Sequence, residues 1–428
     1  MSNIVRKSIA HNVSFSNIKE ERFKTVKLSV TMFVPLAKET AAAYALLPSV
    51  LVHSCKKYPT AIEFNRELSN LYGAGIGAYC RKMGEALAVT ITVAGIDDRY
   101  TMNNEKISSE LVEFLCEVIF NPNAENEAFA KEDFEQCKRQ LLEAIDGEFN
   151  EKRSYAISQM LEEMCRDEKF GIKRYGSRKA VEKLTPSELF RAWKEILENS
   201  RVEIMFIGNS DTVSAENIFR EKFGGMQRTV PDISTEIISG VGEVKQKTEA
   251  SDVAQAKLVM GFRTGFAQPE YESIPMSLTT AILGGTPNSK FFMNIREKLS
   301  LCYYCAARYD KLKGIVTVDS GVERENIERT IQEVLNQLAE MQKGNITDFE
   351  IESAKLAIIN SYKSALDTVS GTEGWYIGQM LDNKILTVDE AVDELKKVDR
   401  NTIVELANTL KLDTIYILQP KSAEEAEV

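Results

Sequence analysis

Histidine is almost absent from this 428-residue chain, which contains only His11 and His53. A catalytic zinc ion in a peptidase needs three protein ligands, usually histidine or carboxylate, and an open position for water. The zinc-hydroxide route also needs a carboxylate as general base. The two histidines are not spaced at i and i+4 of one helix, as the common peptidase motif requires. The sequence therefore argues against a zinc peptidase site formed by this chain alone.

Long apolar runs are missing as well. No stretch of about 18 apolar residues, the length that crosses a bilayer, occurs in the sequence. The opening residues MSNIVRKSIAHNVSF contain no apolar core of signal-peptide length and do not resemble a transit peptide. We therefore expect no membrane partner and a cytoplasmic location.

Acidic residues outnumber basic ones, with 64 Asp and Glu against 53 Lys and Arg, and the formal net charge is −11. This balance disfavours a nucleic-acid partner, whose phosphates bind Lys and Arg, and an anionic membrane surface. It is compatible with basic peptide substrates, but many ordinary soluble proteins are equally acidic. We therefore expect no nucleic acid and give the charge no specific role.

The seven cysteines form an odd and scattered set that does not indicate a disulfide framework. We expect reduced thiols, in agreement with a cytoplasmic location. Cys302 and Cys305 form a C-x-x-C sequence on a predicted strand, where their odd separation should send the two thiols to opposite faces. No second pair is present to complete a zinc site, so we interpret them as structural thiols.

The length suits two to four domains, and the order of elements predicted in the first half repeats in the second. Leu28–Val34 alternates as a strand and precedes an apolar helix, and Lys257–Phe262 does the same before a helix at Glu272–Leu283. Later in each half, Tyr155–Leu161 and Trp375–Leu381 are identical at four of seven positions. Each of these apolar patterns, taken singly, is that of an ordinary strand or helix facing a core. Their repeated order indicates an internal duplication.

The join between the two halves lies in a stretch without sustained periodicity that is rich in Gly, Ser, Thr and charged residues. We predict an N-terminal domain at 1–230, a linker at 231–250 and a C-terminal domain at 251–428. Each half is also expected to contain a capped helix, because Thr60-x-x-Glu63 and Thr347-x-x-Glu350 have the spacing of a capping box.

The most informative segment is Ile282–Tyr304, ILGGTPNSKFFMNIREKLSLCYY. A turn of small residues leads into a helix that carries Phe291, Phe292 and Arg296, and a strand with Tyr303 follows. This arrangement resembles the C-terminal-half signature of the M16 family (the pitrilysin/insulinase clan), which comprises zinc peptidases and mitochondrial processing peptidases.

The resemblance covers nearly the whole chain. It implies an α+β fold of two homologous halves, each pairing a mostly antiparallel sheet with helices, arranged as a clamshell around a chamber. Strand–helix alternation alone would also fit an α/β fold, so the family resemblance decides this expectation.

The family's zinc motif, His-x-x-Glu-His, should lie in the apolar stretch Thr40–Ser54, but the three positions hold Leu46, Ser49 and Val50. Moving the register to use His53 does not restore the other ligands. The distal glutamate ligand corresponds to Ala144. We therefore expect no cofactor in this chain and zinc only in a partner subunit.

In the family, an Arg and a Tyr spaced as Arg296 and Tyr303 contact the substrate and the tetrahedral intermediate. The resemblance also implies that Gly284, Gly285 and Ser289 lie at the substrate. The alternative for Arg296 is a helix-surface ion pair with a neighbour such as Glu297, and for Tyr303 it is a core aromatic residue.

The strand that contains Gly77, Ala78 and Tyr79 corresponds to the edge strand that binds extended peptide in active relatives. The family's usual Asn and Thr are replaced here by Gly77 and Cys80. An ordinary hairpin strand therefore remains an alternative interpretation.

These features predict a zinc-less M16 subunit, not an autonomous peptidase, that binds peptide and supplies Arg296 and Tyr303 to a zinc-bearing M16 paralogue. Some bacterial members form such pairs, and pairs of this type are associated with modification of a translation elongation factor. Self-association as a homodimer is the other form of partnership. The competing hypotheses are a structural or interaction protein and a peptide-binding chamber without a proteolytic role.

Overall fold

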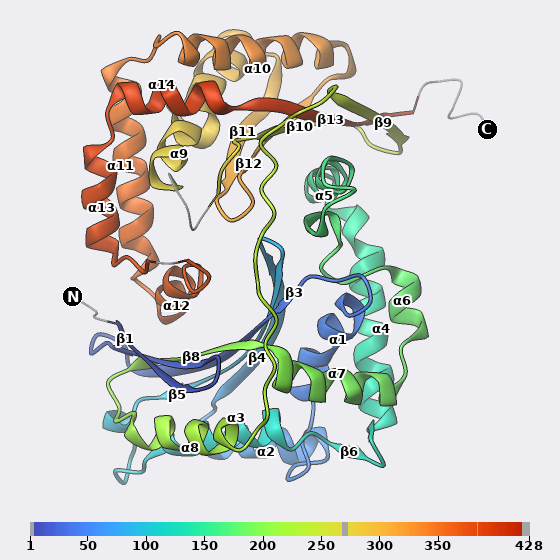
Figure 1. The fold of residues 1–428 in the computed structure, drawn as a ribbon, viewed down its shortest axis with the longest axis vertical. Helices are drawn as coiled ribbons and strands as arrows, with labels where there is room; N and C mark the ends of the chain where they lie inside the picture. Colours follow the sequence, from blue (N-terminus) through green and yellow to red (C-terminus); the bar gives the residue numbers. More distant parts are fainter. Residues whose placement is uncertain (1–3, 268–272, 383, 422–428) are drawn as a thin grey trace. The chain divides into compact units, whose positions relative to one another are not determined.

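The computed structural model describes residues 4–267, 273–382 and 384–421, which form two compact units (Figure 1). The boundaries interleave along the chain. The first unit is made of residues up to 146, 172–234 and 365–380, and the second of 147–171, 235–364 and those from 381 onward.

A six-stranded sheet organises the first unit. Its strand order is β1-β2-β8-β3-β5-β4, and every neighbouring pair is antiparallel except β2 with β8. The strands are β1 (Ile4–Ala10), β2 (Val13–Lys19), β3 (Thr25–Pro35), β4 (Gly75–Met83), β5 (Ala86–Ile96) and β8 (Arg201–Gly208). A separate small ribbon pairs β6 (Ala124–Glu125) with β7 (Ala128–Phe129).

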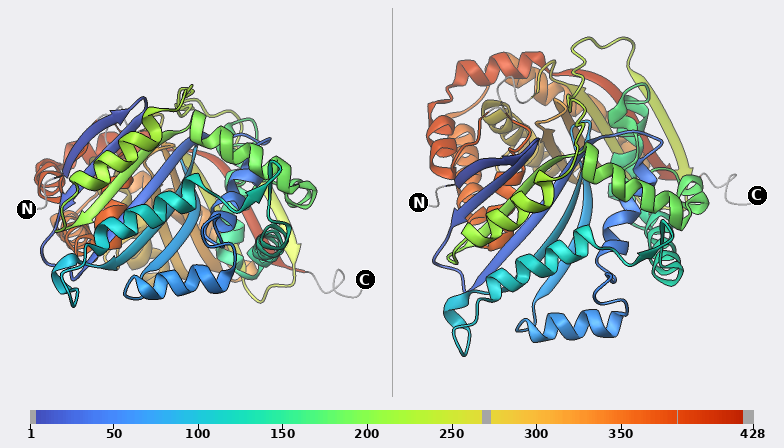
Figure 2. Two further views of the ribbon diagram at one scale, coloured as in Figure 1. Left: turned by 90° about the horizontal axis from the view of Figure 1, so that it is seen from below. Right: turned by 60° about the horizontal axis from the view of Figure 1, so that its bottom comes forward.

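One face of this sheet is covered by helices. Apolar residues of β3, β5 and β8 join those of α1, α3, α7 and α8 in one continuous core. Figure 2 shows α3 and α8 over the sheet, running along the direction of its strands. The helices of the unit are α1 (Ala41–Leu51), α2 (Ala61–Asn70), α3 (Ile107–Phe120), α4 (Lys131–Gly147), α6 (Arg178–Lys183), α7 (Pro186–Asn199), α8 (Val213–Gly224) and α12 (Val369–Ile377), with a 3₁₀ turn η1 (Asp98–Tyr100).

The second unit contains a five-stranded sheet in the order β11-β12-β10-β13-β9, in which only β13 and β9 are parallel. Its strands are β9 (Lys245–Ser251), β10 (Ala256–Arg263), β11 (Cys302–Asp310), β12 (Ile315–Val322) and β13 (Lys411–Pro420). The two sheets have the same connectivity once β1 is set aside, because β2-β8-β3-β5-β4 corresponds to β9-β13-β10-β12-β11. The predicted pair of homologous α+β halves is confirmed, and β4 and β11 are equivalent edge strands.

The helices of the second unit include two π-helical segments. They are α5 (Lys152–Met164), α9 (Ser273–Thr280), η4 (Ala281–Gly285, π), η5 (Phe291–Lys298, π), α10 (Ile327–Gln342), α11 (Asp348–Ala365), α13 (Val388–Lys397) and α14 (Arg400–Thr409), with 3₁₀ turns η2 (Glu148–Asn150), η3 (Lys169–Gly171) and η6 (Arg324–Asn326). The helix expected at Glu272–Leu283 is therefore α9 continued by η4, and Glu272 itself lies outside the described residues. The capping boxes at Thr60 and Thr347 both form as predicted.

The two halves exchange one equivalent helix. Helix α5, from the first half of the sequence, packs on β10 and β13, whereas α12, from the second half, packs on β3 and β8. Gly261 permits the close approach of α5, because a Cβ atom there would lie 2.6 Å from the sulfurs of Met160 and Met164. Residues 147–171 and 365–380 thus depart from the predicted ranges 1–230 and 251–428.

Each exchanged helix also forms an ion pair with its sheet, and the helix contributes the cation in one pair and the anion in the other. On α5, Arg153 pairs with the buried Asp319 of β12 at 2.5 Å. On α12, the buried Glu373 pairs with Lys27 of β3 at 2.6 Å. Each pair joins a helix to the sheet of the unit in which it is packed.

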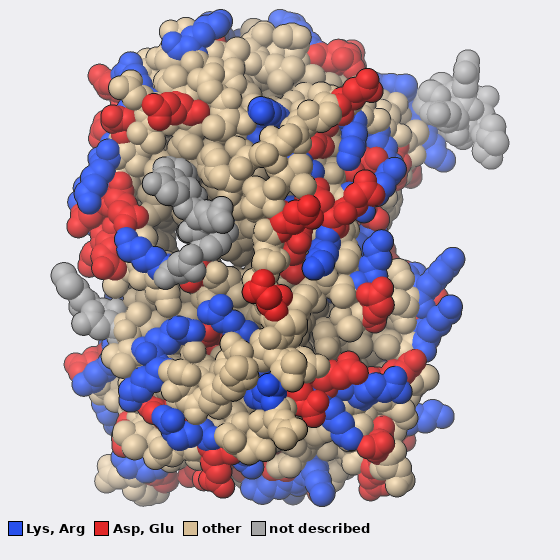
Figure 3. Space-filling view, viewed as in Figure 1, with Lys and Arg blue, Asp and Glu red and all other residues tan. Residues whose placement is uncertain are grey.

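Residues 227–244 contain no helix or strand. The predicted linker at 231–250 extends beyond them into β9, where Lys245 begins parallel pairing with β13. No helix in the described part of the chain is both long and apolar enough to span a membrane. Figure 3 shows acidic and basic side chains mixed over most of the face in view.

Candidate functional site

The positions that correspond to the family's zinc ligands lie on α1, and two of them belong to the core of the first unit. Leu46 is 0% exposed and Val50 is 2% exposed. Their side chains contain only carbon and hydrogen, so neither offers a donor atom to a metal. Ser49 is exposed on the same helix, and Pro48 lies within it without ending it before Leu51.

The other residues considered as zinc ligands either interact with another side chain or have no atom that could bind a metal. His53 follows α1, and its Nε2 lies 3.6 Å from Asp133 Oδ1. Asp133 also accepts a short hydrogen bond from the Ser54 hydroxyl. Ala144 occupies an exposed position of α4. Within residues 4–267, 273–382 and 384–421, no three His, Cys, Asp or Glu side chains converge as a metal site.

Strand β4 carries Gly77, Ala78 and Tyr79 and forms the outer edge of the first sheet. Its inner side pairs with β5, and no other described strand pairs with its outer side. Ala78 packs against the core, while Gly77 and the partly exposed Tyr79 occupy the opposite face. The strand therefore has the geometry that adds an extended peptide by main-chain pairing.

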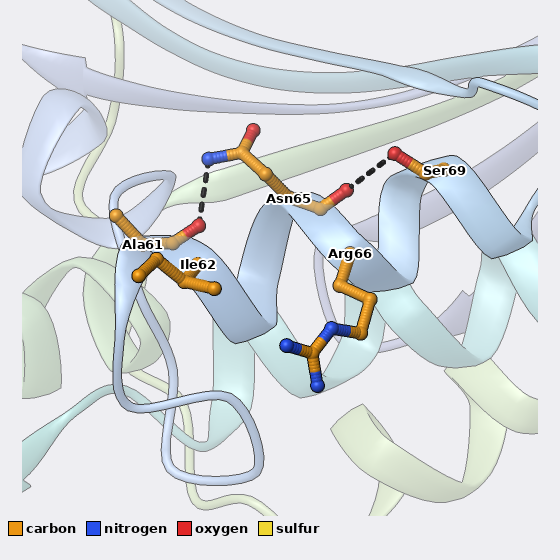
Figure 4. Close-up of a pocket in the computed structure, with 5 residues that line it drawn as sticks. All are labelled: Ala61, Ile62, Asn65, Arg66 and Ser69. Carbon is orange, nitrogen blue, oxygen red and sulfur yellow. Dashed lines mark hydrogen bonds between the residues drawn. The ribbon is translucent and has the colours of Figure 1, made fainter.

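A shallow pocket lies along helix α2 of the same unit (Figure 4). It is lined by Ala61, Ile62, Asn65, Arg66 and Ser69. The Asn65 amide donates to the Ala61 carbonyl at 2.7 Å, and the Ser69 hydroxyl donates to the Asn65 carbonyl at 2.9 Å. These polar groups are thus satisfied within the helix, and the pocket contains none of the residues singled out from the sequence.

In the second unit, Gly284 and Ser289 shape the turn between the two π-helices. A Cβ atom on Gly284 would lie 2.4 Å from the Phe291 ring and 2.8 Å from the Ala307 backbone nitrogen. Ser289 is 1% exposed, and its hydroxyl accepts a hydrogen bond from the Phe292 amide at 3.4 Å. Both positions are buried, so they position η5 against β11, whereas Gly285 is exposed.

Arg296 lies on η5, and its side chain is 41% exposed. The guanidinium is centred 4.5 Å from the Phe292 ring, and its Nε lies 3.6 Å from a Glu297 carboxylate oxygen. The ion pair with Glu297 that the sequence suggested is therefore present. The π-helical geometry was not predicted. Such segments are rare in proteins, and many of those that occur lie at functional sites.

Tyr303 lies near the start of β11 and is 62% exposed, so the alternative of a core aromatic residue is wrong. Its hydroxyl donates a hydrogen bond to Glu323 Oε1 at 2.9 Å. That hydrogen bond and the negative charge of Glu323 raise the pKa of Tyr303 above its usual value. The hydroxyl consequently stays protonated, and able to donate, at neutral pH.

Cys302 and Cys305 are both buried and lie close enough for their thiols to hydrogen-bond. The prediction that they occupy opposite faces is wrong, because the β11–β12 pairing shifts between Cys302 and Tyr304. A bulge adds one residue to the strand and reverses the alternation beyond it. The same bulge places Tyr303 outward. All seven cysteines of the chain lie in its described part and are free thiols, as expected.

The pKa of the Cys302 thiol depends on the groups around it. A hydrogen bond from Cys305, opposed by burial and assisted by Ser320 and the charge of Arg296, lowers the pKa of Cys302 below its usual value. Alkylation by iodoacetamide should therefore rise with pH through a midpoint lower than that of an ordinary cysteine, because the thiolate is the reactive species. Arg296→Met should raise this midpoint by removing the cation, and Cys305→Ala by removing the hydrogen-bond donor.

Peptide mapping by mass spectrometry measures this midpoint residue by residue. Cys116, whose burial raises its pKa to about 12, is an internal reference that should stay unmodified at neutral pH. A midpoint for Cys302 that Arg296→Met leaves unchanged would place the guanidinium away from this thiol.

The four edges of the two large sheets differ in charge. Edge strand β1 contains Arg6 and Lys7, and β9 contains Lys245, Lys247 and Glu249. Charged side chains, Lys above all, discourage pairing at an exposed edge. The equivalent edges β4 and β11 instead begin with uncharged runs, GIGAYC and CYYCAA. These two strands are the edges best suited to bind another chain.

Comparisons with known proteins agree with this fold. The family model described as "Peptidase M16 inactive domain" matches residues 183–358. A probable inactive metalloprotease of Bacillus subtilis, YmfF, is 26% identical over 402 residues, which cover 94% of each chain. The uncharacterized zinc protease YmxG of the same strain is 24% identical over 166 residues, covering 38% of this chain and 40% of that protein.

Solved structures are similar over the whole length. A conserved protein from Enterococcus faecalis V583 superposes with a TM-score of 0.90 at 26% identity, covering 98% of this chain and 99% of that chain. A protein from Pseudomonas fluorescens, described as a peptidase M16 inactive domain, gives a TM-score of 0.78 at 15% identity, with coverage of 98% and 99%.

Proposed function

This chain belongs to the M16 peptidase family as an inactive, metalloprotease-like member, and from that premise we propose that it is the zinc-less subunit of a two-chain peptidase. It binds an extended peptide and supplies Arg296 and Tyr303 to the active site of a zinc-bearing M16 partner. The chain itself holds no cofactor.

One observation carries the proposal. Tyr303 is 62% exposed on an edge strand of the second sheet, and Arg296 lies on the π-helix that packs against that strand. A core residue would be buried there, and a surface residue without a role has no need of the bulge that turns Tyr303 outward.

The chemistry of both side chains suits an oxyanion. Arg is always charged and presents a rigid fork of donors, and Tyr presents one hydroxyl donor. Donors held in place before the reaction stabilise the negative charge that develops in the tetrahedral intermediate. Because Glu323 accepts a hydrogen bond from the Tyr303 hydroxyl in the free chain, a developing oxyanion would compete for the same donor.

The peptide is assigned to β4. Its outer edge and its uncharged run GIGAYC support main-chain pairing, in which Gly77, Ala78 and Tyr79 contribute backbone groups. Gly285, exposed at the turn before η5, is the second candidate for contact with peptide.

The partner is a paralogue that carries His-x-x-Glu-His, or a second copy of this chain for a complex without catalysis. Bacillus subtilis contains relatives of both kinds, one named a probable inactive metalloprotease and one a zinc protease. Seven free thiols support a cytoplasmic setting for such a pair.

A second function is an interaction protein or peptide-binding chamber without a proteolytic role. The partners of Arg296 and Tyr303 favour it, since Glu297 and Glu323 already engage these side chains in the free chain. The two functions differ in whether a zinc-bearing partner becomes a better enzyme when this chain is added.

The isolated chain is expected to contain no stoichiometric zinc and to hydrolyse no unfolded or basic peptide, because Leu46 and Val50 replace ligands with hydrocarbon. Metal analysis of chelator-free protein and a peptide-cleavage assay measure both. Adding the zinc-bearing paralogue should produce a complex, seen by light scattering, and hydrolysis that a chelator abolishes. One tightly bound zinc per isolated chain, or a paralogue that neither binds nor responds, would contradict the proposal.

A further inference from the structure

We propose that the peptide bound at β4 is acidic: a carboxylate of the peptide binds Arg81 on the polar face of the first sheet, the face that also carries Thr92. This inference rests on the proposed function for the peptide-binding edge and adds the chemical class of peptide that the edge selects.

Arg81 lies on β4, two residues beyond Tyr79. Alternate residues of this strand occupy opposite faces, and Ile76, Ala78 and Cys80 pack against the core. Gly77, Tyr79 and Arg81 therefore share the other face. That face also presents Thr92 of β5, which is the register partner of Gly77.

Several polar atoms on this face are buried without a partner. Nε and Nη2 of Arg81 and Oγ1 of Thr92 form no hydrogen bond with any residue that the structure describes. Buried polar groups in folded proteins are nearly always paired, so these three unpaired atoms on one face of the sheet require an explanation. All three are able to donate a hydrogen bond, which makes an acceptor the matching ligand.

Gly77 leaves the approach to Thr92 open. A Cβ atom built on Gly77 would already contact the Thr92 methyl group at 3.4 Å, so any longer side chain would lie over this threonine. The family's usual Asn at this position would fill the same space. The glycine therefore creates a notch between the peptide edge and the threonine hydroxyl.

Arg81 forms no ion pair with any residue that the structure describes, and two of its nitrogens are buried. Lys27 and Glu373 form an ion pair at 2.6 Å and cancel each other, although Oε1 of Glu373 has no hydrogen-bond partner among the described residues. The positive charge of Arg174 lies near the thiol of Cys80 and favours its deprotonation, but Cys80 belongs to the core face of the strand. The guanidinium of Arg81 is therefore available to a ligand, and a guanidinium binds a carboxylate through two parallel hydrogen bonds.

Tyr79 adds a neutral donor beside Arg81. Burial first, and then the charge of Glu373, raises the pKa of Tyr79 above its usual value. Its hydroxyl therefore stays protonated at neutral pH. The net charge of −11 for the whole chain does not oppose this assignment, because a buried ion pair depends on the groups within a few ångströms.

The test is binding of short fluorescent peptides to the full-length chain, followed by anisotropy. The probes are eight-residue extended peptides of Val, Thr and Ser with one Glu moved through the sequence, each matched by a Gln peptide. We expect the best Glu peptide to bind about tenfold more tightly than its Gln match, as one charge-assisted bidentate contact supplies.

Arg81→Met should remove this preference, and Arg81→Lys should retain only part of it because the charge stays and the fork is lost. Arg66→Met on α2 is the matched control and should leave the preference intact, since Arg66 lies on a helix outside the sheet. Thermal unfolding of both Arg81 variants checks that the fold persists.

Equal binding of Glu and Gln peptides, or a preference that survives Arg81→Met, would overturn the inference and leave main-chain binding at β4 standing. Failure of every peptide to bind would overturn both the inference and the assignment of peptide to β4. Neither result affects the assay of Arg296 and Tyr303, which tests the rest of the proposed function.

Discussion

Glu168→Ala is expected to lower the free energy of unfolding by about 3–5 kcal/mol, the cost of leaving buried charges without their partner. Glu168 accepts hydrogen bonds from Arg263 at 2.6 Å and makes an ion pair with Lys313 at 2.7 Å. Arg263 also pairs with Asp413 at 2.7 Å. The side chains of all four residues are at most 9% exposed, and their charges sum to zero. Removing Glu168 leaves one positive charge uncompensated in the second unit.

The effect should depend on pH. Burial alone would raise the pKa of Glu168, but hydrogen bonds from Arg263 and Lys313 outweigh it and lower the pKa below 4.5. A carboxyl group with a lowered folded-state pKa stabilises the protein above its unfolded-state pKa, and this contribution is lost as the pH falls through the folded-state value. The difference between wild type and variant should therefore be full at pH 7 and shrink below about pH 4.5.

Chemical denaturation at both pH values measures this difference. Glu127→Ala removes an exposed carboxylate that pairs with Lys194 at 2.6 Å, and it should cost no more than about 1 kcal/mol. The double variant Glu168→Ala, Lys313→Met should lose less than the sum of its parts, because Arg263 and Asp413 then balance. Equal losses for Glu168→Ala and Glu127→Ala would show that the buried network does not hold this region.

The duplication was predictable from the sequence because it depends on periodicity. Strand alternation at Leu28–Val34 and Lys257–Phe262 and the repeated segment after residue 150 all follow local patterns that a helix or strand must satisfy. The exchange of α5 and α12 was not predictable. An amphipathic helix has the same pattern whichever sheet it covers, and the tight packing at Gly261 joins positions far apart in the chain.

The C-x-x-C sequence shows a second limit. Counting residues along a regular strand places Cys302 and Cys305 on opposite faces, and one bulge near Tyr303 reverses the result. A bulge depends on how β11 pairs with β12, and the sequence of β11 alone does not show this pairing. Tyr303 itself could be selected from sequence only through the family resemblance.

Arg81 was missed for a related reason. The family resemblance at this strand ends at Cys80, and an arginine on a strand gives no sign that its nitrogens are buried and unpaired. Only the register that places Thr92 opposite Gly77 brings these groups to one face. A signal was nevertheless present: a cationic residue two positions beyond Tyr79, on the face that alternation assigns to the polar side.

Tyr303→Phe and Arg296→Lys should each lower kcat of the reconstituted two-chain peptidase by about one to three orders of magnitude. Tyr303→Phe removes only the hydroxyl, and Arg296→Lys keeps the charge but loses the planar fork. Both side chains are substantially exposed, so folding and affinity for the partner should change little. A loss confined to kcat would indicate a donor that acts in the transition state.

The most direct measurement of the central claim is therefore kcat of a zinc-bearing paralogue saturated with wild-type chain, each of these variants, or matched controls. Tyr100→Phe is an exposed tyrosine control. Arg400→Lys is an arginine control, with a side chain 42% exposed and paired to Asp348. We predict that the wild-type chain and both controls support full activity, while Tyr303→Phe and Arg296→Lys do not. Equal kcat for all five chains, or a paralogue as active without any of them, would contradict catalysis in trans.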